Sequence, residues 1–421
     1  MRGGTKLLAV SLMAGALAWP LAAQLQVPGV PVRVPPVGGV LGEVNGQLEQ
    51  TVEQASALTG REARRLLQLR ERTLGRLLRA NPQAIERDAV GNLARRGELL
   101  ATGLAEPGFA VLEQAGFRVL AREQIEGLDI AFARIAVPAG MTLAEGQGRV
   151  AELVPEAEVE ADTLHLEAGG QMAPRPLPLA AMAAAATAAA SNVKVGVIDG
   201  GIGKAVPVSG LRGFAAGAPR ASDHGSAVAS LLQAQGITRL WVADVYGSDP
   251  AGGNASAIAK AVGWLTASGC KVVTVSLVGP RSALVERAIT AAQGKGVVVV
   301  AAVGNDGPAA PPAFPASYAD VLAITGVDRK GRALIEAGRA LHLDYAAPGA
   351  GVFARDATGK IKAWRGTSFA APLAAARVAA ALGSAGAWRA RVDAEARDLG
   401  PRGADKTYGR GLLCGSCAQR K

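Results

Sequence analysis

The second half of the chain alternates short apolar runs with stretches of helical period, and this alternation restricts its possible folds most strongly. The valine-rich runs are VKVGVIDGG (193–201), LWVADVYG (240–247), CKVVTVSLVGP (270–280) and VVVVAAVGNDG (297–307). The helical stretches between them are GSAVASLLQAQ (225–235), SAIAKAVGWLTASG (256–269) and SALVERAITAAQGKG (282–296). Strands that are apolar along their whole length are buried on both faces, which is typical of parallel sheets covered by helices. The sequence therefore predicts an α/β fold with a doubly wound parallel sheet.

The first half of the chain predicts two smaller regions. A Pro-rich arm and a helical segment are expected over 24–96, with leucines among many arginines in RRLLQLRERTLGRLLRANP (64–82). Residues 97–167 read as strand, helix, strand, strand, helix and strand, which predicts a small α+β domain of the split βαβ type. A linker rich in Gly, Pro and Ala follows over 168–191. The remaining regions are the α/β domain, 192–413, and a tail, 414–421.

The N-terminus predicts export. Residues 1–23 carry a short basic start, an apolar stretch and a small-residue end, which is the plan of a cleaved secretory signal. We therefore expect a periplasmic or extracellular protein with no stable membrane insertion once the signal is removed. No other apolar tract is long enough to span a bilayer.

The distribution of charge bears on the partners of the protein, and the three cysteines bear on its disulfides. Residues 24–189 hold 16 basic and 20 acidic side chains, whereas residues 190–421 hold 27 basic and 15 acidic ones. Opposite net charges suit two regions that dock on each other. The basic residues are scattered and aromatic residues are few, so we expect no nucleic-acid partner. Cys270 reads as a buried apolar side chain, and Cys414 and Cys417 could close a small disulfide.

Several polar residues lie where a doubly wound sheet places its active site, at the carboxyl ends of strands. Asp199 ends one apolar run and Asn305 follows another, while His224 begins a helix. Ser368 begins the alanine-rich helix of RGTSFAAPLAAARVAAAL, where it is either an ordinary helix cap or a nucleophile. Asn305 likewise reads either as a turn residue or as a donor to an oxyanion.

These residues lie in motifs that together resemble the subtilisin-like serine proteases. The matching blocks are, in order, VGVIDGGI, DHGSAVA, SLVGP, AAVGNDG, FPASYADVLAITGVD, LDYAAPG and GTSFAAP. The order Asp, His, Ser is that of the subtilisin triad. The resemblance implies that Ser368 is the nucleophile, His224 the general base and Asp199 the residue that orients it.

The resemblance also implies the roles of neighbouring residues. Asn305 and the Ser368 backbone N–H would stabilise the oxyanion. Substrate backbone would pair as an added strand with Ser276, Leu277, Val278 and Gly279, and the pocket would be lined by Ala302, Val303 and Gly304. Residues 97–167 are similar to the family's propeptide, which assists folding and then blocks the cleft. Phe314 and Pro315 are expected to be joined by a cis bond.

The chain also departs from the family pattern. Ser226 and Ala227 replace the usual Thr and second His, and Val278 replaces a common Gly in the pocket wall. The stiff valine predicts a preference for small apolar side chains at P1, the residue whose carbonyl is attacked. No cofactor is expected; calcium is possible, but no site is identifiable in the sequence.

The expected function is a secreted serine endopeptidase that works through an acyl-enzyme and is made as a self-processing zymogen. Its expected partners are protein or peptide substrates and its own propeptide. Three alternatives stay open: a catalytically silent binding protein on the same scaffold, a serine esterase, and a sedolisin-type acid peptidase. A little-perturbed His224 predicts activity that rises with pH near 6–7.

Overall fold

The computed structural model describes residues 60–168, 170–171 and 192–413. The chain divides into two compact units, Met1–Glu49 and Gln50–Lys421, and every described residue lies in the second. The predicted signal segment, the Pro-rich arm, most of the linker, and Cys414 and Cys417 lie outside the described residues. No described helix is long and apolar enough to cross a membrane.

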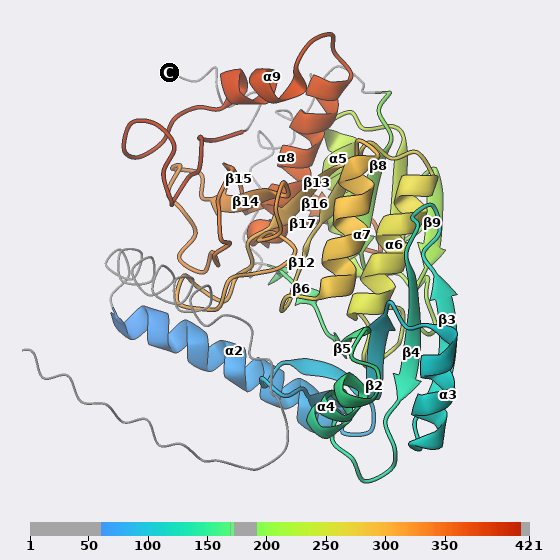
Figure 1. The fold of residues 1–421 in the computed structure, drawn as a ribbon. Coiled ribbons are helices and arrows are strands. Elements are labelled where there is room, and N and C mark those ends of the chain that lie inside the picture. The colour runs from blue at the N-terminus through green and yellow to red at the C-terminus, as the bar shows by residue number, and fades with distance from the viewer. Residues whose placement is uncertain (1–59, 169, 172–191, 414–421) are drawn as a thin grey trace, which may run out of the picture. The chain divides into compact units, whose positions relative to one another are not determined.

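A seven-stranded sheet forms the centre of the C-terminal half (Figure 1). Its strands lie in the order β15 (Tyr345–Pro348), β14 (Leu322–Val327), β13 (Val298–Ala302), β11 (Val272–Val275), β8 (Val195–Asp199), β10 (Leu240–Asp244) and β9 (Gly210–Gly213). All neighbouring pairs are parallel. The carboxyl ends of β8 and β13 therefore lie at the same edge of the sheet.

Helices cover both faces of this sheet. One face carries α5 (Asp223–Ala234) and α8 (Thr367–Leu382), and the other carries α6 (Ala255–Ala267) and α7 (Ala283–Gly294). Successive residues of β8 show the division: Val197 belongs to the apolar cluster with α5 and α8, whereas Ile198 belongs to the cluster with α6 and α7. A short helix, α9 (Trp388–Glu395), follows α8. The predicted doubly wound parallel sheet is confirmed.

A second, antiparallel sheet precedes the first in the chain. Its strands are β1 (Ile85–Arg87), β2 (Leu93–Thr102), β4 (Ala131–Ala136) and β3 (Arg118–Gln124), with β5 (Glu158–Thr163) paired to β2. The helices α3 (Glu106–Gln114) and α4 (Leu143–Leu153) complete the predicted βαββαβ order. We call residues 85–163 the N-terminal sheet domain.

The N-terminal sheet domain buries both faces of its sheet. Leu99 and Ala101 on β2 pack in the domain's own core with α3 and α4. Leu100, which points to the opposite face, joins the apolar cluster that contains α6 and α7. The α6 and α7 surface of the central sheet therefore supplies the second cover of the N-terminal sheet.

The remaining elements lie outside the N-terminal sheet and the central sheet. The helix α2 (Gly60–Ala80) precedes the N-terminal sheet domain, and a hairpin of β16 (Ala350–Arg355) and β17 (Ile361–Arg365) precedes α8. Two short pairings follow the N-terminal sheet: β6 (Leu166–Glu167) pairs with β12 (Leu277–Val278), and β7 (Gly170–Gln171) pairs with β17.

The structure differs from the sequence predictions at two places. The predicted helical segment ends at Ala80, and β1 and the start of β2 occupy part of 85–96, so the expected boundary at 97 falls inside β2. The adjacent Arg95 and Arg96 hide the apolar alternation of this strand. The single strand predicted over 270–280 is also two strands, because β12 leaves the central sheet to pair with β6.

Candidate active site

Asp199 and His224 face each other at the edge of the central sheet. Asp199 is the last residue of β8 and is fully buried. His224 lies in the first turn of α5, where the N-cap Ser222 accepts hydrogen bonds from the backbone N–H groups of His224 and Gly225. The Nδ1 atom of His224 lies 2.9 and 3.0 Å from the two carboxylate oxygens of Asp199. When Nδ1 carries the proton and donates a hydrogen bond to this carboxylate, Nε2 is unprotonated and can act as a base.

Ser368 lies on the other side of the imidazole, in the first turn of α8. Its hydroxyl oxygen is 3.0 Å from Nε2 of His224. Gly366, the N-cap residue of α8, lies two residues before Ser368. Its φ of 141 is a conformation that residues with a side chain rarely adopt. The positive end of the helix dipole favours negative charge that develops beside Ser368. The carbonyl of Ser368 accepts a hydrogen bond from the Ser276 hydroxyl at 2.9 Å.

Asn305 follows β13 and reaches the same point. Its Oδ1 accepts a hydrogen bond from the backbone N–H of Thr367 at 3.0 Å, which orients the amide. Its Nδ2 donates to the carbonyl oxygen of Ala168, and the backbone N–H of Ser368 donates to the same oxygen at 3.1 Å. Two donors from separate elements thus converge on one carbonyl oxygen, as an oxyanion-stabilising site requires.

The charges around the imidazole favour its protonated form. Burial opposes a charge on His224, but Asp199 and then Glu167 outweigh burial and raise the pKa of His224 to about 9. Glu167 is an exposed residue, but its carboxylate is close to both groups. Burial of the carboxylate raises its pKa, and the His224 charge opposes this rise. The titration near 6–7 was predicted for a little-perturbed imidazole, whereas both carboxylates raise the pKa of His224 and Asp199 has the larger effect.

The arrangement of these residues agrees with the comparisons with known proteins. The model of the Subtilase family matches residues 190–411, more than half of the chain. The chain belongs to the subtilase family. It is a subtilisin-like serine protease, that is, a serine endopeptidase.

Individual relatives cover the same region. Subtilisin DY from Bacillus licheniformis is 33% identical over 249 residues, 53% of this chain and 89% of that protein. Alkaline elastase YaB from a Bacillus strain is 34% identical over 197 residues, 43% of this chain and 52% of that protein. The crystal structure of fervidolysin from Fervidobacterium pennivorans, a keratinolytic enzyme related to subtilisin, aligns with a TM-score of 0.61 at 18% identity. That alignment covers 77% of this chain and 61% of that one, and it supports the fold.

A segment of the chain itself pairs with the residues that were predicted to receive substrate. Leu166 and Glu167 form β6, which is antiparallel to β12 with Leu166 opposite Val278. The Ala168 N–H donates to the Ser276 carbonyl at 3.0 Å. Residues 276–278 of the segment predicted to receive substrate backbone thus pair with residues 166–168. We call residues 164–168 the cleft strand.

The predicted pocket residues divide into two groups. Val278 and Gly304 lie against each other: a Cβ placed on Gly304 would be 3.2 Å from Cγ1 of Val278. The side chain of Val278 therefore occupies space beside Gly304. Ala302 and Val303 are fully buried in the apolar clusters on the two faces of the central sheet. The structure therefore brings Val278 and Gly304 together, whereas Ala302 and Val303 are core residues.

The predicted cis bond lies near the same segment. The peptide bond between Phe314 and Pro315 is cis, as predicted. The backbone of Phe314 pairs with that of Gly279 by a hydrogen bond in each direction, of 2.9 and 3.1 Å. The loop that carries Phe314 therefore holds the end of the segment that was predicted to receive substrate.

Two carboxylates of β5 cap the helices α7 and α6. Glu160 accepts hydrogen bonds from the Ser282 hydroxyl and from the N–H groups of Ala283 and Leu284. Asp162 accepts from the N–H and hydroxyl of Ser256, each at 2.9 Å. Carboxylates stabilise the positive ends of helices, so these two side chains attach the N-terminal sheet domain to residues 192–413, which we call the protease domain.

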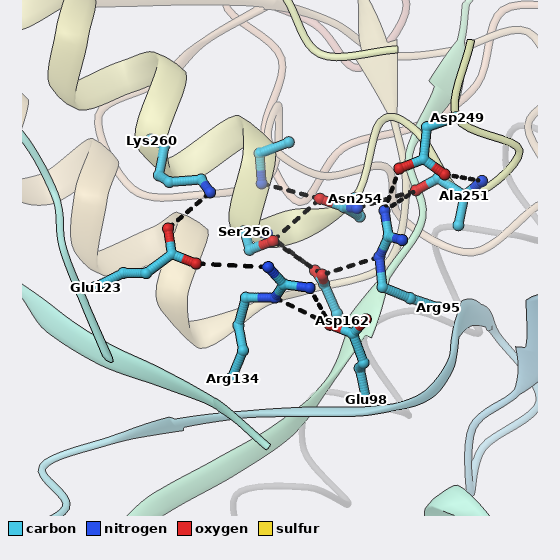
Figure 2. A network of polar contacts seen from close by, with 11 residues as sticks. Arg95, Glu98, Glu123, Arg134, Asp162, Asp249, Ala251, Asn254, Ser256 and Lys260 are labelled. Carbon is cyan, nitrogen blue, oxygen red and sulfur yellow. Dashed lines mark hydrogen bonds and ion pairs between the residues drawn. The ribbon is translucent and has the colours of Figure 1, made fainter. Parts of the chain in front are cut away.

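Ion pairs surround the Asp162 contact (Figure 2). Arg95 lies between Asp162, at 3.8 Å, and Asp249, at 2.5 Å. Glu123 forms an ion pair with Lys260 of α6, with 2.7 Å between Oε2 and Nζ. The pair of Glu123 with Lys260 has the polarity that the net charges of the two halves predict, whereas the pair of Arg95 with Asp249 has the opposite polarity.

The described residues contain one group whose atoms are close enough to share a metal ion, and it consists of Glu167, Asp199 and His224. Calcium takes six to eight oxygen ligands, whereas this group offers an imidazole that already contacts Ser368. The group does not fit calcium, and we assign it no metal.

The sequence contains almost no pattern that predicts the pairing of the cleft strand with residues 276–278. The sequence places Ala168 at the start of a linker and Glu167 at the end of a strand, and it predicts no role for either. The available signal is the short alternation in LHLEA directly before the Gly-rich linker, which is compatible with an added strand. Ser222 also escapes prediction, because an N-cap serine beside a histidine has no distinguishing pattern.

Proposed function

We propose that this subtilase is exported as a zymogen whose N-terminal sheet domain is an inhibitory propeptide, and that the chain cuts itself after Ala168. The observation that carries the proposal is the Ala168 carbonyl, which accepts hydrogen bonds from both Asn305 and the backbone N–H of Ser368. A carbonyl held by both donors of an oxyanion site is positioned for attack by the adjacent hydroxyl.

The proposed catalytic roles follow from these contacts. His224 removes the proton of the Ser368 hydroxyl as its oxygen attacks the Ala168 carbonyl carbon, while Asp199 stabilises the resulting imidazolium. The tetrahedral oxyanion is held by Asn305 and the Ser368 N–H. His224 then donates its proton to the departing amine of Gly169, and the acyl-enzyme on Ser368 is hydrolysed by water. The same steps cleave other protein or peptide substrates once the cleft strand has left.

The propeptide role is supported by the contact surface. The cleft strand occupies the positions where substrate backbone would pair, and Glu160 and Asp162 fix the domain to two helices of the protease domain. A domain held in this way blocks the cleft before and after the cut. Export is supported by the signal-like residues 1–23 and by the similarity to the subtilisins, which are secreted.

The test is the fate of the purified full chain. Wild type should yield an N-terminal fragment that ends at Ala168, as measured by mass spectrometry, whereas Ser368→Ala should stay intact. Reaction of Ser368 with a fluorophosphonate should appear only after the cut fragment has dissociated. If Ser368→Ala is still cut in a preparation free of other proteases, self-cleavage is wrong.

A further inference from the structure

The helix α2 precedes the N-terminal sheet domain and has partners both in that domain and in the protease domain. It is 21 residues long, and at 1.5 Å per residue it spans about 30 Å. One side is rich in exposed arginine, while Ala63 and Leu74 are buried. Figure 1 shows it as a separate blue rod that leads into the first sheet.

The first half of α2 contacts the loop that carries Asn305. Arg70 forms an ion pair with Asp306, with 3.2 Å between Nε and Oδ2. Leu66 packs on Gly307, where an added Cβ would lie 2.7 Å from Cδ1 of Leu66. Asp306 and Gly307 directly follow Asn305. This half of α2 therefore touches the protease domain beside the oxyanion site.

The second half of α2 shares an apolar cluster with the cleft strand. Leu74 is buried in this cluster together with Ile85 and Leu93 of the N-terminal sheet domain, Leu164 of the cleft strand and Ala251 of the protease domain. Leu77 and Leu78 of α2, together with Leu166 of the cleft strand, pack against the same cluster. The backbone of Leu166 pairs with β12. The side chains of Leu164 and Leu166 share one apolar cluster with the leucines of α2.

A role limited to folding of the first sheet does not account for both sets of contacts. Such a role would explain the ion pair between Glu71 and Arg87 of β1. It would also explain the packing of Leu74 with Ile85 and Leu93 of the same sheet. It would not explain Leu66 and Arg70, whose partners Gly307 and Asp306 belong to the protease domain. The helix thus contacts both the cleft strand and the protease loop beside it.

We propose that α2 is a second inhibitory element, which retains the cleft strand in the cleft by binding the protease surface formed by Asp306, Gly307 and Ala251. The inference rests on the proposed zymogen function. After the cut behind Ala168, α2 stays joined to the cleft strand through the N-terminal sheet domain. Release of the cleft therefore requires that α2 leave the loop next to Asn305.

The first experiment measures amide hydrogen exchange of the cleft strand in the full-length Ser368→Ala chain, in which no cut occurs. Leu66→Asp introduces a charge where Leu66 packs on Gly307, and it should raise exchange of residues 164–168 about tenfold. The matched control is Leu69→Asp, because Leu69 is on the same helix and is 47% exposed. Equal exchange in Leu66→Asp and Leu69→Asp would overturn the proposal.

The second experiment uses surface charges, which do not endanger folding, in the chain with Ser368 intact. Arg70→Glu places a negative charge beside Asp306 and should shorten the interval between self-cleavage and peptidase activity about three- to fivefold. The control is Arg72→Glu, an exposed position two residues further along α2. An interval equal to that of the control contradicts the α2 contact. Absence of any cut in wild type would refute the zymogen function alone, since the exchange measurement still decides the role of α2.

Discussion

The carbonyl oxygen of Ala168 accepts a hydrogen bond from the backbone N–H of Ser368, with 3.1 Å between oxygen and nitrogen. This contact joins the end of the cleft strand to the first turn of α8, although the two residues are 200 positions apart in the chain. It gives Ala168 the P1 position of the proposed self-cleavage. The rate of that cleavage therefore reports on the pocket, the oxyanion site and the charges around this carbonyl.

The pocket should accept small side chains, because Val278 fills space beside Gly304. Ala168→Phe should slow self-cleavage about 5- to 150-fold, which corresponds to an overpacking cost of about 1–3 kcal/mol. Val278→Gly should restore part of this rate. The measurement is the appearance of the cut fragments over time, with Ala168→Ser as the small-residue control. Cleavage of Ala168→Phe at the rate of wild type would show that Val278 does not limit the pocket.

Asn305 should contribute to the rate rather than to the fold. Asn305→Ala removes one of two donors to the Ala168 oxygen and should slow self-cleavage about 10²- to 10³-fold, the range seen when one oxyanion donor is lost. The substitution also removes the acceptor for the Thr367 N–H, so the thermal midpoint of the Ser368→Ala chain with and without it serves as control. An unchanged cleavage rate would remove Asn305 from the proposed oxyanion site.

Asp162 should make the folded chain more stable as the pH falls. Burial raises the pKa of Asp162 from 3.8 to about 6, and hydrogen bonds from Ser256 and the charge of Arg95 only partly oppose this rise. A carboxyl with a raised pKa binds its proton more tightly in the folded state. Its contribution to stability therefore improves as the pH falls through about 6 and is complete below about 4.

The measurement compares two full-length chains with Ser368→Ala, one of which also carries Asp162→Asn. Between pH 7 and pH 4 the chain that keeps Asp162 should gain about 2–3 kcal/mol of unfolding free energy relative to the chain with the amide, since one pKa unit corresponds to about 1.4 kcal/mol. The comparison cancels the other carboxylates, including Glu98, whose charge also acts on Asp162. Parallel pH dependences of the two chains would contradict the buried, proton-binding state of Asp162.

The central sheet and much of the site can be predicted from the sequence, because both depend on local patterns. Apolar runs broken by helices predict a parallel sheet, and the carboxyl ends of parallel strands share one edge. That geometry places Asp199 and Asn305 at the same edge of the sheet. The Gly-Thr-Ser step predicts that Ser368 lies at a helix start, where the structure has it.

The occupant of the cleft cannot be predicted in this way. The pairing of Leu166 with Val278 joins segments far apart in sequence, and a two-residue strand carries almost no periodic signal. The start of β2 is hidden because the side chain of Arg95 is charged, and its partner Asp249 lies in the other half of the chain. Both differences concern long-range contacts that local patterns do not encode.

Glu167 should restrain self-cleavage at neutral pH. Burial lowers the pKa of His224, but the charges of Asp199 and Glu167 raise it to about 9, so the imidazole is mostly protonated at pH 7 and cannot accept the Ser368 proton. Glu167→Gln removes one of these charges and keeps the side-chain length. Each unit by which the pKa of His224 falls should speed self-cleavage at pH 7 about tenfold, because the rate follows the fraction of free base.

The pH profile of self-cleavage separates this effect from a change in binding. The rising limb should shift to lower pH in Glu167→Gln, while the rate on the alkaline plateau should change little, since His224 is already a free base there. The control is Glu156→Gln, which removes an exposed carboxylate just before β5. A profile of Glu167→Gln that superimposes on that of Glu156→Gln would show that the charge of Glu167 does not control the protonation of His224.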